Sequence, residues 1–178
     1  MKNSINYYRN LLITAYTEKN PAYNPARDSG LNGKALELAI KDHYGKKLTV
    51  GRQGKTDLRI GSRNADVKSG ASDLGNVNDR LIKGSGLVVF VPVPLMDYDI
   101  TMQEGYVMDR ADFLAALESV GALRDKTMTD GTTHKTLQTF WNAKQNKAHG
   151  RLLDKMLTAF EEYGARDMVE MLEEYGVN

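Results

Sequence analysis

Cysteine is absent from this chain of 178 residues. Its absence excludes disulfide scaffolds, cysteine-ligated zinc, iron–sulfur clusters and thiol nucleophiles. Histidine is scarce as well, with three scattered residues, so a histidine-rich metal site is not expected. Any metal bound by this protein is therefore expected to have oxygen ligands.

Long hydrophobic runs are also missing. The longest apolar stretch is the short run at 87–91, which is far below the length of a membrane span. The N-terminal residues lack the apolar segment and small-residue cleavage site of a signal peptide. We therefore expect a cytoplasmic protein that has no membrane partner.

The residues that are present are typical of a single folded domain. Hydrophobic residues make up 41% of the chain and charged residues 26%, which is enough for a packed core. The net charge of +1 conceals an uneven distribution, because residues 1–90 carry 15 basic and 8 acidic side chains, whereas residues 91–178 carry 9 and 15. This split indicates either an anionic ligand for the first half or attraction between the two halves.

Hydrophobic periodicity predicts the elements of the first two thirds of the chain. Helices are expected at 5–16 and 31–44, and strands at 47–50, 56–60, 65–68, 87–93 and 105–108. A further helix should begin at Asp109 or Asp112 and end at Gly121. Residues 69–86 are polar and form either a functional loop or a short helix at 76–82.

The last third reads as helical, with helices at 134–147, 151–163 and 165–175 separated by Gly150 and Gly164. The expected fold is α/β, a small mixed β-sheet flanked by helices with a helical C-terminal subregion. We assign residues 1–130 to the α/β core and residues 131–178 to a helical extension packed on it, within one domain overall.

The segment 56–68 is the most informative part of the sequence. Gly61-Ser62-Arg63-Asn64 is typical of a turn, so the flanking runs predict a β-hairpin in which Asp57 lies opposite Lys68 and Arg59 opposite Asp66. Alternation then places the apolar residues on one face and the charged residues on the other. The two carboxylates and the Lys68 ammonium would lie roughly 5–8 Å apart.

This grouping is suited to phosphodiester chemistry. Two nearby carboxylates, Asp57 and Asp66, can hold Mg²⁺, a hard cation that prefers oxygen ligands. The metal polarises a phosphodiester and activates water. Lys68, on the same face as Asp66, can orient the attacking water or offset negative charge on the phosphate.

Asp57 together with Asp66-Val67-Lys68 resembles the motif of the PD-(D/E)xK nuclease superfamily, although Thr56 stands at the proline position of that motif. The resemblance implies a restriction-endonuclease-like core over about 31–94. It also implies a Mg²⁺-dependent nuclease, with Mn²⁺ as an alternative metal, acting on DNA in preference to RNA and often as a homodimer. Glu37, on the preceding helix, would be a third metal ligand or a general base.

Two structural explanations compete with this site. An amphipathic hairpin with a solvated face would place the same opposite charges across from each other as ordinary stabilising pairs. Glu37 likewise has Lys34 and Lys41 at the spacing of helix-surface ion pairs, so it is equally suited to an exposed helix face.

Basic residues surround the proposed site and are candidates for contacts with backbone phosphates. They are Lys47, Arg52, Lys55, Arg59 and Arg63. Two other functions remain open at this point. One is a non-catalytic nucleic-acid-binding protein of the same fold, and the other is a small interaction protein that docks through its acidic C-terminal helices.

Overall fold

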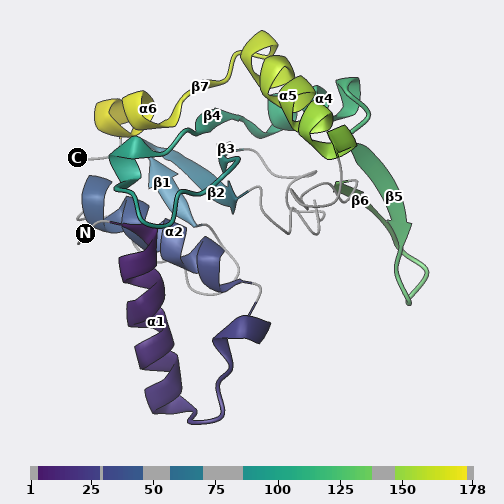
Figure 1. Ribbon diagram of the computed structural model, residues 1–178. Coiled ribbons are helices and arrows are strands. Elements are labelled where there is room, and N and C mark those ends of the chain that lie inside the picture. Colours follow the sequence, from purple (N-terminus) through teal and green to yellow (C-terminus); the bar gives the residue numbers. More distant parts are fainter. Residues whose placement is uncertain (1–3, 29, 46–56, 70–85, 138–146, 176–178) are drawn as a thin grey trace.

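The computed structural model describes residues 4–28, 30–45, 57–69, 86–137 and 147–175 (Figure 1). In these ranges the protein is an α/β structure with a five-stranded mixed sheet and five α-helices. The sheet order is β1 (Leu58–Ile60), β2 (Arg63–Ser69), β3 (Leu87–Val91), β4 (Tyr106–Asp109) and β7 (Arg166–Asp167). The β2 and β3 strands are parallel, and all other neighbours in the sheet are antiparallel.

The helices of the first half follow the sequence pattern closely. Helix α1 (Ile5–Lys19) begins after Ser4, whose hydroxyl accepts a hydrogen bond from the Tyr7 N–H at 3.2 Å. It ends before Pro21, because proline cannot continue the helical hydrogen bonding. Helix α2 (Leu31–Tyr44) has the predicted bounds, and its apolar stripe of Leu36, Ala39 and Ile40 is buried.

Both faces of the sheet are covered. On one face, alternate residues of β3 (Leu87, Val89 and Val91) pack into a core with α1, α2 and α6 (Met168–Tyr175). On the other face, Val88 and Phe90 pack with α4 (Arg110–Ser119) and α5 (Lys147–Glu162). The predicted strand at 87–93 is therefore fully buried over β3, and its continuous apolar run serves two cores.

The C-terminal third departs from the prediction in three places. Residues predicted to begin a helix at 134 instead form β6 (Thr133–Leu137), which pairs with β5 (Leu123–Thr127), a strand the sequence pattern did not predict. Helix α5 runs across Gly150, where a break was expected. Arg166 and Asp167, which were predicted to be helical, form β7 and add a fifth strand to the main sheet.

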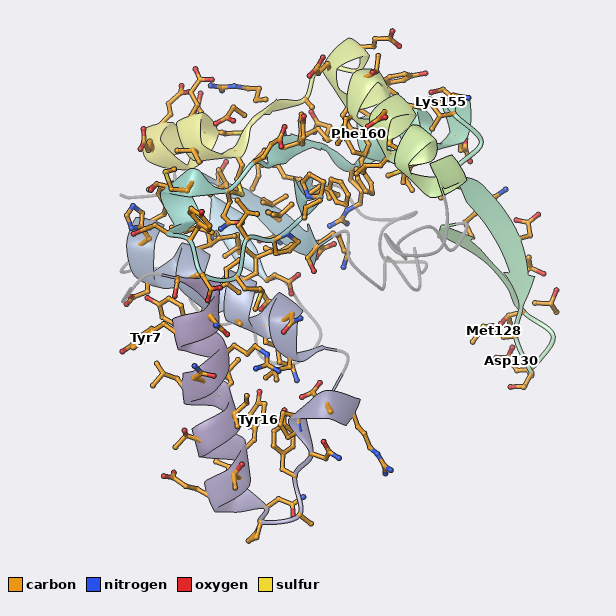
Figure 2. All side chains as sticks on the ribbon, viewed as in Figure 1. Tyr7, Tyr16, Met128, Asp130, Lys155 and Phe160 are labelled. Carbon is orange, nitrogen blue, oxygen red and sulfur yellow. The ribbon has the colours of Figure 1, made fainter. Side chains whose placement is uncertain are left out.

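The β5–β6 hairpin extends away from the main sheet, with Met128 and Asp130 at its tip (Figures 1 and 2). The backbone N–H and C=O groups of β5 and β6 hydrogen-bond to each other in this two-stranded ribbon, and this pairing replaces the helix predicted from residue 134. The predicted strand at 47–50 and the segment 70–85 lie outside the described residues. Within the described residues, no helix is long and apolar enough to cross a membrane.

Candidate functional site

The β1–β2 hairpin turns more tightly than predicted. Its register pairs Leu58 with Ala65, Arg59 with Asn64 and Ile60 with Arg63, so Gly61 and Ser62 alone form the loop. Gly61 has a φ of +59°, which favours glycine in such a two-residue turn. The observed register differs from the predicted one by two residues, and an even shift leaves every β2 side chain on its predicted face.

The predicted cross-strand charge pairs are consequently wrong. Arg59 lies opposite Asn64 instead of Asp66, and its guanidinium makes a 3.5 Å contact with the Ser62 carbonyl. The solvated-hairpin interpretation expected the same Asp57–Lys68 and Arg59–Asp66 pairs, and the register forms neither pair.

Asp57 lies at the point where β1 separates from β2. Its Oδ2 accepts a hydrogen bond of 2.9 Å from the backbone N–H of Val67. The side chain thereby takes the place of a backbone acceptor in the strand ladder, and this contact fixes the position of the carboxylate. The other oxygen, Oδ1, has no hydrogen-bond partner among the described residues.

Asp66 is held by a residue of α4. Its Oδ2 accepts a hydrogen bond of 2.7 Å from Nη2 of Arg110, the first residue of that helix. The two side chains are largely buried, with 21% of the Asp66 surface and 9% of the Arg110 surface exposed. Asp66 is therefore the ion-pair partner of a residue that lies 44 positions further along the chain.

Glu37 projects from α2 toward the same hairpin. Burial raises the pKa of its carboxyl from 4.5 to about 7, and the negative charge of Asp57 adds to the rise. The ammonium groups of Lys41 and Lys68 oppose this shift, and Lys41 Nζ lies 4.0 Å from Glu37 Oε2. Glu37 therefore lies within electrostatic reach of both Asp57 and Lys68, and only 26% of its side chain is exposed.

Lys68 is half-buried on β2. Its ammonium makes no hydrogen bond or ion pair with any residue in the described ranges. The charge of Lys68 acts on Glu37, whose pKa it lowers. Glu37, Asp57 and Lys68 thus supply two carboxylates and one cation from α2, the start of β1 and β2.

The basic residues proposed to contact phosphates have mixed outcomes. Lys47, Arg52 and Lys55 lie outside the described residues. Arg59 is exposed on β1. Arg63 forms an ion pair with Asp109 and donates to the Gly86 carbonyl at 3.3 Å, so part of its hydrogen-bonding capacity is used within the fold.

The structure adds two buried basic neighbours to the site, of which the sequence pattern indicated only Lys41. Arg110 and Lys41 are buried charged residues, each 8% exposed, and each contacts a predicted site carboxylate. Lys41 follows Glu37 at i+4, and this spacing was visible but equally typical of a helix surface. No local signal links Arg110 to Asp66, because the contact depends on how α4 packs against the sheet.

Two of the three predicted metal ligands, Glu37 and Asp57, are suited to a hard divalent cation. Glu37 and Asp57 offer carboxylate oxygens close enough to repel one another, which is the situation that a bound cation relieves. Asp66 is committed to Arg110. Among the described residues, no group of three or more histidine or acidic side chains is already gathered as a metal site.

The chain was also compared with known proteins. No protein-family model, no curated protein and no solved structure matches it.

Proposed function

We propose that this chain is a Mg²⁺-dependent nuclease that acts on DNA and has a restriction-endonuclease-like core. The observations that carry the proposal are the electrostatic interactions of Glu37 with Asp57 and Lys68 and the hydrogen bond from the Val67 N–H that fixes the Asp57 carboxylate. In this proposal Asp57, Asp66 and Glu37 hold the metal, with Mn²⁺ as an alternative, and Lys68 faces the substrate.

The element order supports the fold assignment. Helix α2 is followed by the β1–β2 hairpin and then by β3, which lies parallel to β2. A parallel neighbour requires a crossover connection, and the nuclease core has a helix in that position. The segments that would hold the first core strand and this helix fall within 46–56 and 70–85, outside the described residues.

The side chains have distinct roles in the proposed reaction. Mg²⁺, when bound, supplies Lewis-acid polarisation of the scissile phosphate. Asp57 is held in place by the Val67 N–H and keeps one oxygen for a ligand. Lys68 offers its ammonium to the phosphate, where negative charge increases in the transition state.

Glu37 is suited to proton transfer as well as to metal binding. A carboxyl whose pKa is about 7 accepts and releases a proton at neutral pH, as a general base must. Ordinary glutamates titrate too low to accept a proton from water effectively near pH 7. As the alternative to its role as a metal ligand, Glu37 would therefore take the proton of the attacking water.

The test is cleavage of plasmid DNA by the full chain in Mg²⁺, with Asp57→Asn and Lys68→Met as variants. The amide introduced by Asp57→Asn retains an oxygen for the Val67 N–H but lacks the charge, so folding and chemistry are separated. We expect a loss of cleavage of about 100-fold or more in each variant. Glu118→Gln, an exposed change on α4, is the control and should cleave as the unmodified chain does.

Full cleavage by either variant, or cleavage that persists in excess chelator, would overturn the proposal. Circular dichroism of each variant establishes that the fold is retained.

A non-catalytic nucleic-acid-binding protein is the second candidate. The observation that favours it is the ion pair between Asp66 and Arg110, which occupies a carboxylate that catalysis requires. It predicts DNA binding that weakens steeply with salt, together with no cleavage in Mg²⁺ or Mn²⁺.

A further inference from the structure

Helix α1 and the segment that leads back to α2 extend away from the sheet (Figure 1). The buried residues of α1 are Ile5 and Tyr8, so the helix joins the core near its first turns. Every residue from 9 to 28 is at least partly exposed. Packing in the two cores therefore does not explain the aromatic residues at this outer end.

Two tyrosines meet at the outer end. The rings of Tyr16 and Tyr23 pack edge to face, with centroids 5.2 Å apart, and both residues are partly exposed. Tyr16 lies on the side of α1 that faces the returning segment (Figure 2). The hydroxyl of Tyr23 donates to Asp28 Oδ2 at 2.9 Å, which holds its ring in one position. A ring held at the surface in this way is suited to stacking with a nucleobase.

Two cations lie beside these rings. Lys34 Nζ lies 5.5 Å from the centroid of the Tyr16 ring. Arg9 donates from Nε to Asn32 Oδ1 at 3.1 Å, and this bond directs its guanidinium. Burial raises the pKa of Tyr23, and the positive charge of Arg9 opposes this rise, so Arg9 lies within electrostatic reach of that ring. Rings and cations therefore form one group, the aromatic–basic cluster, which consists of Arg9, Tyr16, Tyr23 and Lys34.

The charge around the aromatic–basic cluster favours an anionic partner. Residues 5–34 carry four basic side chains (Arg9, Lys19, Arg27 and Lys34) and two acidic ones (Glu18 and Asp28). The Asp28 carboxylate already accepts hydrogen bonds from the Tyr23 hydroxyl and the Gly30 N–H. Basic side chains attract phosphates, and aromatic rings among them add a surface for bases. Nucleic acid with unpaired bases fits both features.

We propose that the aromatic–basic cluster binds single-stranded DNA, with a base stacked on Tyr23 and backbone phosphates on Arg9 and Lys34. This inference rests on the proposed function and adds a substrate class to it, since only unpaired bases offer a face for stacking. Tyr16 is a positioning residue, because it contacts both the Tyr23 ring and the Lys34 ammonium. Lys34 also interacts electrostatically with Glu37, so α2 connects the cluster to the proposed site.

The first experiment measures binding by fluorescence anisotropy. The full chain is titrated into a labelled single-stranded oligonucleotide of about 15 nucleotides, in chelator so that no cleavage occurs. Tyr23→Ala should weaken binding by about tenfold, the usual effect of removing one stacked ring. Tyr23→Phe keeps the ring and should stay within about twofold of the unmodified chain. A blunt duplex of the same length should bind more weakly, and equal binding of the duplex would contradict stacking.

The second experiment tests the phosphate contacts through salt. Lys34→Gln should weaken binding and lower the slope of log affinity against log salt by about 0.7, the value for one phosphate contact on a single strand. Lys155→Gln is the matched control, because it removes the same charge from an exposed position on α5, far from the aromatic–basic cluster (Figure 2). Its affinity and its slope should equal those of the unmodified chain.

A third measurement needs no variant and therefore applies even if Tyr23→Ala fails to fold. In NMR spectra of the unmodified chain, the ring signals of Tyr23 should shift during titration with the oligonucleotide, because a stacked base shields the ring. The ring signals of Tyr163, which lies just after α5 and is 38% exposed, should remain unchanged. Tyr23 signals that stay still at saturating oligonucleotide would overturn the proposal.

The outcomes separate this inference from the proposed function. If the chain cleaves DNA in Mg²⁺ but Tyr23→Ala and Lys34→Gln bind the oligonucleotide normally, the cluster is not the binding surface and the nuclease stands. An equal loss in Tyr23→Phe and Tyr23→Ala would contradict stacking, and an equal loss in Lys155→Gln would show general electrostatics. If the oligonucleotide binds as described and no cleavage occurs in Mg²⁺, the nuclease is wrong and the binding surface stands.

Discussion

Glu37 is interpreted differently from the sequence alone and from the folded structure. At its position on α2 an acidic residue flanked by lysines is typical of a solvated helix face. In the folded chain only 26% of its side chain is exposed, and the carboxylate of Asp57 lies within electrostatic reach. Burial is therefore the larger cause that disfavours the ionised Glu37 carboxyl, and the negative charge of Asp57 is the next largest.

This raised pKa makes a prediction about stability. Because the folded chain holds the Glu37 proton up to about pH 7 and the unfolded chain releases it near 4.5, the contribution of this group is fully present below pH 4.5. It is lost as the pH rises through 7. The loss should amount to about 2–3 kcal/mol in the free energy of unfolding.

Urea denaturation of Glu37→Gln in chelator tests this expectation. The variant should gain stability relative to the unmodified chain as the pH rises from about 5 to about 8, because glutamine does not ionise. Glu118→Gln, at an exposed position, should show a difference that does not vary with pH. A constant difference for Glu37→Gln would mean that the carboxyl titrates normally.

At the scale of an element, the β1–β2 hairpin keeps its predicted faces although its register differs from the predicted one. Its amphipathic alternation survives a shift of two residues in register, because side chains alternate with a period of two. The tighter turn moves Asp57 beyond the paired part of β1, where its carboxylate serves as acceptor for the Val67 N–H. One side chain thereby has a structural role in addition to the metal-binding role that we propose for it.

Substitution at Asp57 separates these two roles. Asp57→Ala leaves the Val67 N–H without its acceptor and should destabilise the hairpin by about 1–2 kcal/mol. Asp57→Asn retains an acceptor oxygen and should cost less. Hydrogen exchange of the Val67 amide is the measurement, and faster exchange is expected in the alanine variant alone. If the Val67 amide exchanges in both variants as slowly as in the unmodified chain, the Asp57 contact contributes nothing to the hairpin.

At the scale of the whole molecule, the two cores fix the position of the site. The core containing α2 brings Glu37 to the hairpin, and the core containing α4 brings Arg110 to Asp66. Met156, Ala159 and Phe160 of α5 and Met168 and Leu172 of α6 are buried in these cores, while Glu161, Glu162 and Glu173 are exposed. Docking through the acidic helices would therefore involve polar surfaces.

Phe160 anchors α5 to the second core (Figure 2). It is fully buried, stacks on Phe113 with ring centroids 5.3 Å apart and meets the Phe90 ring edge to face at 5.4 Å. Phe160→Ala should lower the free energy of unfolding by about 3–5 kcal/mol. Tyr163→Ala, one turn later and 38% exposed, should cost less than about 1 kcal/mol in the same urea titration.

Loss of stability in Phe160→Ala should also reach the site, since α4 would lose the helix that covers it. If the two alanine variants unfold at the same urea concentration, α5 is not a stabilising part of this core.

The sequence alone determined the features that depend on local periodicity. The bounds of α2, the burial of β3 and the segregation of charged and apolar residues on β2 all follow from spacings of two or three to four residues. The pattern of Asp57, Asp66 and Lys68 could be recognised in the sequence for the same reason. Its interpretation as a nuclease site stays a prediction.

Only the tertiary structure decided which charges meet. The Asp66–Arg110 pair and the electrostatic interaction of Glu37 with Asp57 join segments that no local pattern links. The predicted helix at 134–147 was wrong over β6 because strand formation there depends on a partner strand, which a helical spacing rule ignores. Contacts between distant segments arise from packing, and packing decided which carboxylate has a guanidinium for a partner.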